Sequence, residues 1–168
     1  MTYIDKSELF QEIATKLTEK GFKIESEDQN RPWGGFFVIN EDQAQEFANA
    51  YFEGMDVQDL KISGKLSPKV LIVGPNKRLS WQYHHRRAEI WRVIRGEVGV
   101  VTSPTDEEHE LKILKEGDSI RLSQGERHRL VGLGSYGVVA EIWQHTDSAN
   151  PSDEEDIVRV QDDFGRGV

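Results

Sequence analysis

The sequence predicts a mostly β domain, a small barrel or sandwich, with two helical segments near its N-terminus. From about Lys69 onward, short β-rich runs alternate with turn residues, which is typical of sandwiches and small barrels. Two stretches with apolar residues at helical spacing precede them. Hydrophobic residues make up 36% of the 168 residues. We therefore expect one domain with a packed core: a helical extension with one strand (1–60), a barrel core (61–147) and a tail (148–168).

Capping residues mark the two helices. Asp5 can cap the first helix, with Glu8 three residues later as in a capping box, and Gly21 suits its C-terminal stop. The second helix is expected to begin near Asn40, with Gly54 after its apolar stripe. The segment between them, 33–39, is predicted to be a strand.

Eight further strands are predicted in the barrel core, most of them followed by a turn that contains Gly, Pro, Asn or Asp. They are expected at 69–73, 79–84, 89–94, 97–102, 110–114, 119–122, 128–131 and 136–144.

Composition limits the possible partners and location. The formal net charge is -9, which argues against nucleic acid or an anionic membrane as a partner but still permits a small anionic substrate. The sequence has no cysteine, which excludes disulfides and thiolate metal sites. The N-terminus lacks a basic-then-apolar signal pattern, and no apolar run approaches the ~20 residues that span a bilayer. We therefore expect a cytoplasmic protein.

Four side chains suited to binding a metal ion lie on the predicted strands. Gln82 and His84 are two residues apart and face the same side of a strand, whereas His85 faces the opposite side. Glu89 opens the next strand and His128 begins a later one. Imidazole suits zinc, iron or nickel, carboxylate suits harder ions, and an amide oxygen is a weak neutral ligand. A surface or core role for each residue is the competing interpretation.

The spacing of these residues resembles the two cupin motifs. The segment from Gln82 to Gly96 reads Gln-x-His-x4-Glu-x6-Gly, with Gln in the first His position. The segment from Gly117 to Gly132 resembles the second motif through Gly117, Gly125 and His128, although Ser123 replaces its Pro and Gly132 its Asn. This resemblance implies a cupin jelly-roll β-barrel.

Longer stretches resemble the C-terminal cupin of type II mannose-6-phosphate isomerases. The similar segments are 31–34, 82–91, 155–159 and 162–166. In that family the metal site uses one Gln, two His and one Glu, so the resemblance implies Gln82, His84, Glu89 and His128 as ligands. It also implies one divalent metal ion, zinc first, with manganese, cobalt, nickel or iron as alternatives.

Several features depart from the family pattern. The guanylyltransferase half that usually precedes this cupin is absent, so synthesis of GDP-mannose cannot be carried over. The helix between Asn40 and Gly54 is an insertion, Arg86 stands where a His is usual, and so does Ile90.

The resemblance implies isomerisation of a small phosphorylated sugar, most simply mannose 6-phosphate to fructose 6-phosphate, feeding polysaccharide synthesis. Arg87 is expected to contact the phosphate, because a guanidinium fork matches phosphate oxygens; a surface ion pair with an acidic residue is the alternative role.

Lys69 could shuttle a proton or contact phosphate, or be an exposed strand residue. Arg159 and Arg166 could supply cations from a tail folded over the barrel mouth, or belong to a structural strap in which Asp162 and Asp163 pair with Arg. The sequence does not assign the base that moves the proton; Lys69 and an unidentified carboxylate are the candidates.

Two other functions compete with the isomerase. A non-catalytic metal-containing cupin that binds a sugar phosphate would bind ligand without turnover, because one fold hosts many functions. A metal-dependent oxygenase usually has three His ligands, so Gln82 counts against it. Cupins often pair through their outer sheets, so we expect a homodimer.

Overall fold

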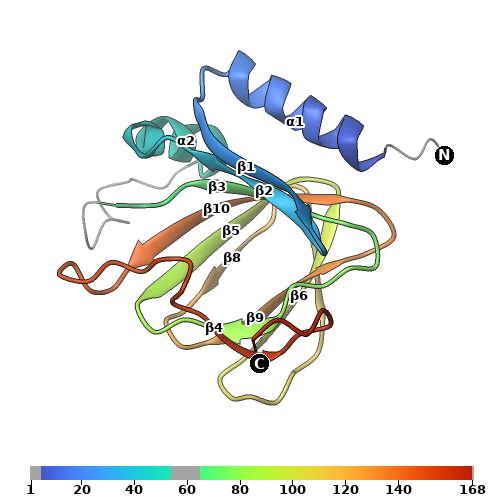
Figure 1. Cartoon of the computed structure of the whole chain (residues 1–168), viewed down its shortest axis with the longest axis vertical. Helices are drawn as coiled ribbons and strands as arrows, with labels where there is room; N and C mark the ends of the chain where they lie inside the picture. Colours follow the sequence, from blue (N-terminus) through green and yellow to red (C-terminus); the bar gives the residue numbers. More distant parts are fainter. Residues whose placement is uncertain (1–4, 54–64, 168) are drawn as a thin grey trace.

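The computed structural model describes residues 5–53 and 65–167, which form two antiparallel sheets with two helices packed outside one of them (Figure 1). The first sheet has the strand order β1-β2-β3-β10-β5-β8 and the second β11-β4-β9-β6-β7. The strands are β1 Ile24–Arg31, β2 Gly34–Ile39, β3 Lys69–Val73, β4 Trp81–Tyr83, β5 Arg87–Arg95, β6 Glu97–Ser103, β7 Lys112–Lys115, β8 Ser119–Leu122, β9 Arg127–Gly132, β10 Gly137–His145 and β11 Val158–Gln161. The mostly β class is confirmed.

Both predicted helices are present. Helix α1, Lys6–Glu19, begins after Asp5, whose side chain accepts a hydrogen bond from the backbone N–H of Glu8. Gly21 follows with a φ of 89°, a left-handed conformation that glycine adopts at low cost. Asn40 caps a short 3-10 helix, Glu41–Gln43, which leads into α2, Ala44–Tyr51. The expected stop at Gly54 lies outside the described residues.

Each predicted strand overlaps an observed one, but β1 and β11 were not expected. Strand β1 has the sequence IESEDQNR, which lacks the apolar alternation that indicates a strand. It forms because it pairs with β2 at the edge of the sheet, where α1 contacts it. Strand β11 is short and depends on pairing with β4. Both strands therefore form because they pair with a neighbouring strand, not because their own sequences alternate apolar and polar residues.

Alternate strand residues divide the core into two main layers. The outer layer packs α1 and α2 against the first sheet and contains Phe10, Phe37, Phe47, Ile72 and Ile142. The inner layer lies between the two sheets and contains Leu71, Trp91, Val100, Leu130 and Val139. The helices therefore cover the outer face of the first sheet, and the space between the two sheets is lined by strand residues alone among those named here. Within the described residues, no helix is long and apolar enough to cross a membrane.

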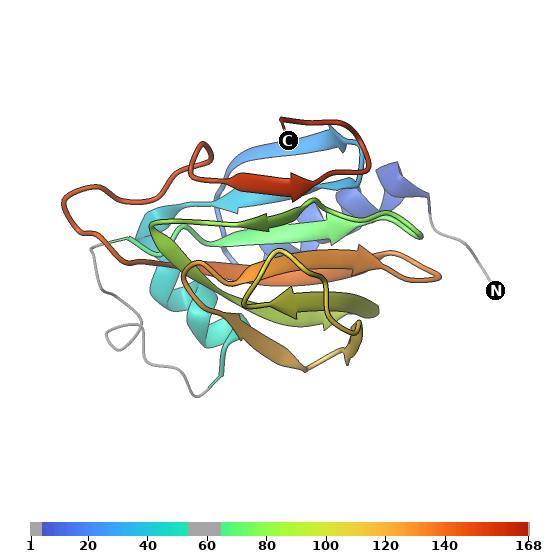
Figure 2. The same cartoon turned by 90° about the horizontal axis from the view of Figure 1, so that it is seen from below.

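One end of the barrel interior is polar. On the first sheet, Glu141 of β10 lies opposite Trp91 of β5 on one side and Lys69 of β3 on the other. Two residues further along β10, Trp143 lies opposite Glu89 of β5. After β10 a long loop extends beyond the sheets before the chain returns as β11 (Figure 2). This return places the tail beside the polar end.

Candidate metal centre

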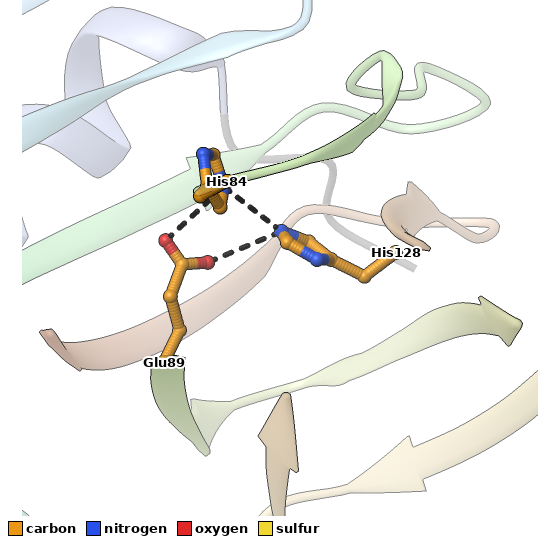
Figure 3. A group of neighbouring side chains, drawn as sticks. All are labelled: His84, Glu89 and His128. Atoms are coloured by element: carbon orange, nitrogen blue, oxygen red, sulfur yellow. Dashed lines mark hydrogen bonds and ion pairs between the residues drawn. The ribbon is translucent and has the colours of Figure 1, made fainter. Parts of the chain in front are cut away.

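Three buried side chains from different segments converge inside the barrel (Figure 3). His84 follows β4, Glu89 lies in β5 and His128 lies in β9; each is 2% exposed. The Nε2 atoms of the two histidines are 3.3 Å apart. The carboxylate oxygens of Glu89 lie 3.2 Å from Nε2 of His128 and 3.6 Å from Nε2 of His84. Their ligand atoms lie within 4.8 Å of one another, so the group could hold a metal ion.

Backbone carbonyls orient both imidazoles. Nδ1 of His84 lies 2.7 Å from the carbonyl oxygen of Asp156, and Nδ1 of His128 lies 3.1 Å from that of Glu126. A carbonyl only accepts, so each Nδ1 carries the proton and each Nε2 of a neutral ring presents a lone pair. Burial lowers the pKa of His84 to about 3, which keeps this ring neutral. Two lone pairs and a carboxylate therefore face one point, the arrangement that a cation stabilises.

Gln82 completes the predicted ligand set. Its Cα is paired with that of His128 across β4 and β9, and its amide nitrogen lies 3.5 Å from Nε2 of His84. The hydroxyl of Ser80 contacts the amide oxygen. A half-turn of the amide would direct its oxygen towards the imidazoles while the NH2 group donates to Ser80. Two imidazole nitrogens, a carboxylate and an amide oxygen fit a divalent metal ion.

Arg87 is buried against this cluster rather than exposed. Its Nε donates to Glu89 at 2.9 Å, one terminal nitrogen donates to Ser152 and the carbonyl of Asp153, both at 3.0 Å, and the guanidinium lies 3.5 Å from the Trp143 ring centre. Burial alone would raise the pKa of Glu89, but the neighbouring charge of Arg87, the largest of the opposing influences, holds it well below its usual value. Because Glu89, Ser152 and Asp153 already accept hydrogen bonds from these nitrogens, Arg87 orients the Glu89 carboxylate in this structure. Its contact with a phosphate stays a prediction.

A cavity of about 150 Å³ adjoins the cluster inside the barrel. Its charged lining includes Arg31, Lys69, Arg87, Glu89, Glu141, Glu154, Arg159 and Arg166. Arg31 pairs with Asp28, and Arg166 pairs with Asp162. Burial and the neighbouring charges of Arg166 and Arg31 lower the pKa of Arg159. Its buried Nε has no hydrogen-bond partner among the described residues, which makes this part of the cavity suited to an anion.

Two charged residues of the first sheet face the same cavity. Lys69 is buried, lies 4.3 Å above the Trp143 ring and pairs with Glu154 of the tail loop. Glu141 is 5% exposed, and burial together with the charge of Glu89 raises its pKa to about 7. Glu141 was not singled out from the sequence. A Glu at an inward position of the otherwise apolar run 137–143 was the available signal.

The tail both lines the cavity and ties the barrel together. Arg159 lies opposite Gln82 in the β4–β11 pair. Asp163 binds Arg78, and the Asp156 carboxylate accepts from the backbone N–H groups of His85 and Arg86. The tail can therefore hold the barrel together through its carboxylates and also place the arginine Arg159 in the cavity wall, so the two interpretations are compatible. The His85 side chain is exposed and stands outside the cluster.

Comparison with known proteins identifies the family. Residues 40–162 match the model of the mannose-6-phosphate isomerase C-terminal family. The chain belongs to this family. It is 31% identical over 136 residues to the xanthan biosynthesis protein XanB of Xanthomonas campestris, covering 81% of this chain and 23% of XanB. It is 29% identical over 146 residues to the alginate biosynthesis protein AlgA of Pseudomonas aeruginosa, covering 84% of this chain and 24% of AlgA. The chain thus spans about a quarter of these relatives.

A solved structure supports the fold of this mannose-6-phosphate isomerase C-terminal domain. The capsular polysaccharide assembling protein CapF of Staphylococcus aureus superposes with a TM-score of 0.52 at 14% identity, covering 83% of this chain and 34% of CapF. At this identity the similarity concerns the fold alone. Together with the two facing sheets, it confirms the predicted cupin jelly roll.

Proposed function

We propose that this domain is a metal-dependent aldose–ketose isomerase that interconverts mannose 6-phosphate and fructose 6-phosphate. The observation that carries the proposal is the convergence of His84, Glu89 and His128 beside a cavity with arginines in its wall. The family match supports the same reaction. We further propose a cytoplasmic homodimer that supplies sugar phosphate for nucleotide-sugar and polysaccharide synthesis.

The metal-binding end of the cavity would hold the reacting part of the sugar. A divalent metal ion bound by Gln82, His84, Glu89 and His128 would supply positive charge to stabilise negative charge developing on the sugar oxygens. Arg87 keeps Glu89 ionised and oriented. The carbonyls of Asp156 and Glu126 keep the histidine Nε2 atoms directed inward.

The arginine end would bind the phosphate. Arg159 has an unpartnered buried Nε, and Arg31 and Arg166 are close enough to lower its pKa. A dianionic phosphate would relieve the mutual repulsion of these guanidinium groups and accept their hydrogen bonds. We therefore assign the phosphate to Arg159 first, with Arg31 and Arg166 beside it. Zinc is the proposed metal because it commonly binds histidine nitrogens together with carboxylate oxygens, the atoms that His84, His128 and Glu89 offer here.

A coupled assay of mannose 6-phosphate conversion tests the proposal. The protein is stripped with chelator and reloaded in turn with zinc, manganese, cobalt, nickel or iron. We expect metal-dependent turnover that is lost in Gln82→Ala and His128→Ala and retained in the exposed control His85→Ala. Arg159→Met should raise KM for mannose 6-phosphate by at least tenfold while the bound metal stays stoichiometric.

A sugar-phosphate-binding cupin without activity is the second candidate. The engagement of Arg87 by Glu89, Ser152 and Asp153 favours it, because this arginine is then less available to a substrate. Its signature is an increase in melting temperature with mannose 6-phosphate but no turnover with any metal. That result would refute the isomerase and support the binding role.

A further inference from the structure

The cavity contains a buried carboxylate outside the proposed ligand set. Glu141 occupies the middle strand of the β3–β10–β5 group, with Lys69 opposite it on one side and Trp91 on the other. Trp143, two residues along β10, lies opposite Glu89. Because residues two apart share a strand face, Glu141 and Glu89 are diagonal neighbours on the inner face of the sheet.

Two tryptophans hold the Glu141 carboxylate in place. The indole N–H of Trp91 donates to Oε2 at 2.7 Å, and the indole N–H of Trp143 donates to Oε1 at 2.8 Å. These bonds fix the orientation of the carboxylate but supply no positive charge. Lys69, the cation opposite it in the sheet, is paired with Glu154. Burying a carboxylate without a bound cation is costly, so its retention here points to a chemical role.

The other carboxylates that line the cavity are committed elsewhere. Glu89 contacts both histidines and Arg87. The Glu154 side chain is 69% exposed and pairs with Lys69. Glu141 alone among these three cavity-lining carboxylates is buried, oriented and free of an ion pair in the described part of the chain.

We propose that Glu141 is the catalytic residue that carries the proton between C2 and C1 of the sugar, an assignment that rests on the proposed isomerase function. The carboxylate removes the proton from C2 of the open-chain aldose, the C2–H electron pair forms the C1–C2 double bond, and the carbonyl pair moves to O1. The O2 hydroxyl proton passes to O1, the O2 electron pair forms the C2=O2 double bond of the ketone, and the C1=C2 pair takes the proton back from Glu141 at C1. Atoms and electrons balance without an oxidant or reductant.

The surroundings of Glu141 suit a group that gains and loses a proton. The charged groups facing it are Lys69 from β3 and Glu89 and Arg87 from β5. Glu89 disfavours the ionised form, whereas Lys69 and Arg87 favour it. These opposing influences allow both forms of the carboxyl group near neutral pH, as general acid–base catalysis requires.

Glu141→Gln in the metal-loaded protein tests the assignment, with Glu155→Gln, an exposed glutamate of the tail loop outside the cavity lining, as the matched carboxylate-to-amide control. Metal content, kcat and KM for mannose 6-phosphate, and solvent deuterium incorporation into the recovered sugar phosphates are measured. For Glu141→Gln we expect stoichiometric metal, KM within about threefold, and kcat and deuterium incorporation lowered ~10²–10⁴-fold. Glu155→Gln should keep kcat within about twofold of the parent, because proton-transfer effects of this size require a group that reaches the substrate.

Different failures have different meanings. If the parent protein turns over and Glu141→Gln is equally active, the isomerase function stands and the assignment of Glu141 is wrong. A parent that shows neither turnover nor deuterium incorporation with any metal overturns the isomerase function and this assignment with it. If Glu141→Gln fails to fold, Glu141→Asp takes its place, because it keeps the carboxylate but moves it; an unchanged kcat and pH profile in that variant overturns the assignment.

Discussion

The Nε2 atoms of His84 and His128 lie 3.3 Å apart, and the Nδ1 atom of each ring faces a backbone carbonyl. With the ring protons committed to those carbonyls, two lone pairs meet beside the carboxylate of Glu89. Such a group of electron donors is stabilised by a cation. The backbone carbonyls that accept from the two Nδ1 atoms therefore orient the histidines so that their Nε2 atoms could bind one metal ion.

Replacing His84 should remove the metal, whereas replacing its neighbour should not. His84→Ala deletes a nitrogen from the buried cluster, but the His85 side chain is exposed and its ring contacts Tyr83 instead. We expect His84→Ala to lose the stoichiometric metal ion and His85→Ala to retain it. Elemental analysis after gel filtration measures both. Equal metal loss in the two variants would contradict the assignment of strand faces.

The tail loop should contribute to metal affinity through Asp156. Its carbonyl orients His84, and its carboxylate binds Ser152 and the backbone N–H groups of His85 and Arg86. Asp156→Ala should weaken metal binding ~10- to 100-fold, as loss of a partner behind a ligand typically does. Competition with a chromophoric chelator gives the affinity. The exposed neighbour provides the control: Glu155→Ala should bind as the parent does, and a similar loss in both variants would argue against an oriented ligand.

Stability should fall in mild acid because His145 is buried as a neutral ring. Its Nδ1 accepts from the backbone N–H of Ser152, and its Nε2 lies 3.1 Å from the Ser67 hydroxyl. Burial, with the charges of Lys65 and Arg87, lowers the pKa of His145 to about 4. Between this value and the usual pKa of ~6.5 the unfolded chain binds more protons, so stability falls as pH drops through that window, by up to ~1.4 kcal/mol per pH unit.

Urea unfolding at pH 7 and pH 5 measures this effect. His145→Gln cannot take up the proton, so its free energy of unfolding should change less between the two pH values than that of the parent. His109→Gln alters an exposed histidine and should leave the parent's pH dependence unchanged. An undiminished pH dependence in His145→Gln would show that another group is responsible.

Gly132 should tolerate no side chain, unlike Gly134 two residues later. A Cβ on Gly132 would lie 1.9 Å from the backbone oxygen of Gly74, whereas a Cβ on Gly134 would meet nothing within 4 Å. Gly132→Ala should lower the free energy of unfolding by ~1–3 kcal/mol or more, the usual cost of overpacking. Gly134→Ala should remain within about 0.5 kcal/mol of the parent, as surface substitutions do. Chemical denaturation that ranks the two variants equally would contradict this packing.

Local patterns in the sequence predicted much of the fold and the composition of the candidate site. Helix α1 was predictable because the Asp5 cap acts three residues away, on the N–H of Glu8. The inward-facing Gln82 and His84 followed from strand alternation, and their combination with Glu89 and His128 from motif spacing. These features depend on short-range geometry, which neighbouring residues determine by themselves.

Only the tertiary structure decided how distant segments complete that site. The polar strand β1 exists because β2 pairs with it, and β11 exists because β4 does. Arg87 became a partner of Glu89 and the tail, and Glu141 was brought opposite Lys69 and Trp91 by strand pairing. Register and burial arise when residues far apart in the chain pack together, so one-dimensional spacing could nominate the metal ligands but not the environment that orients them.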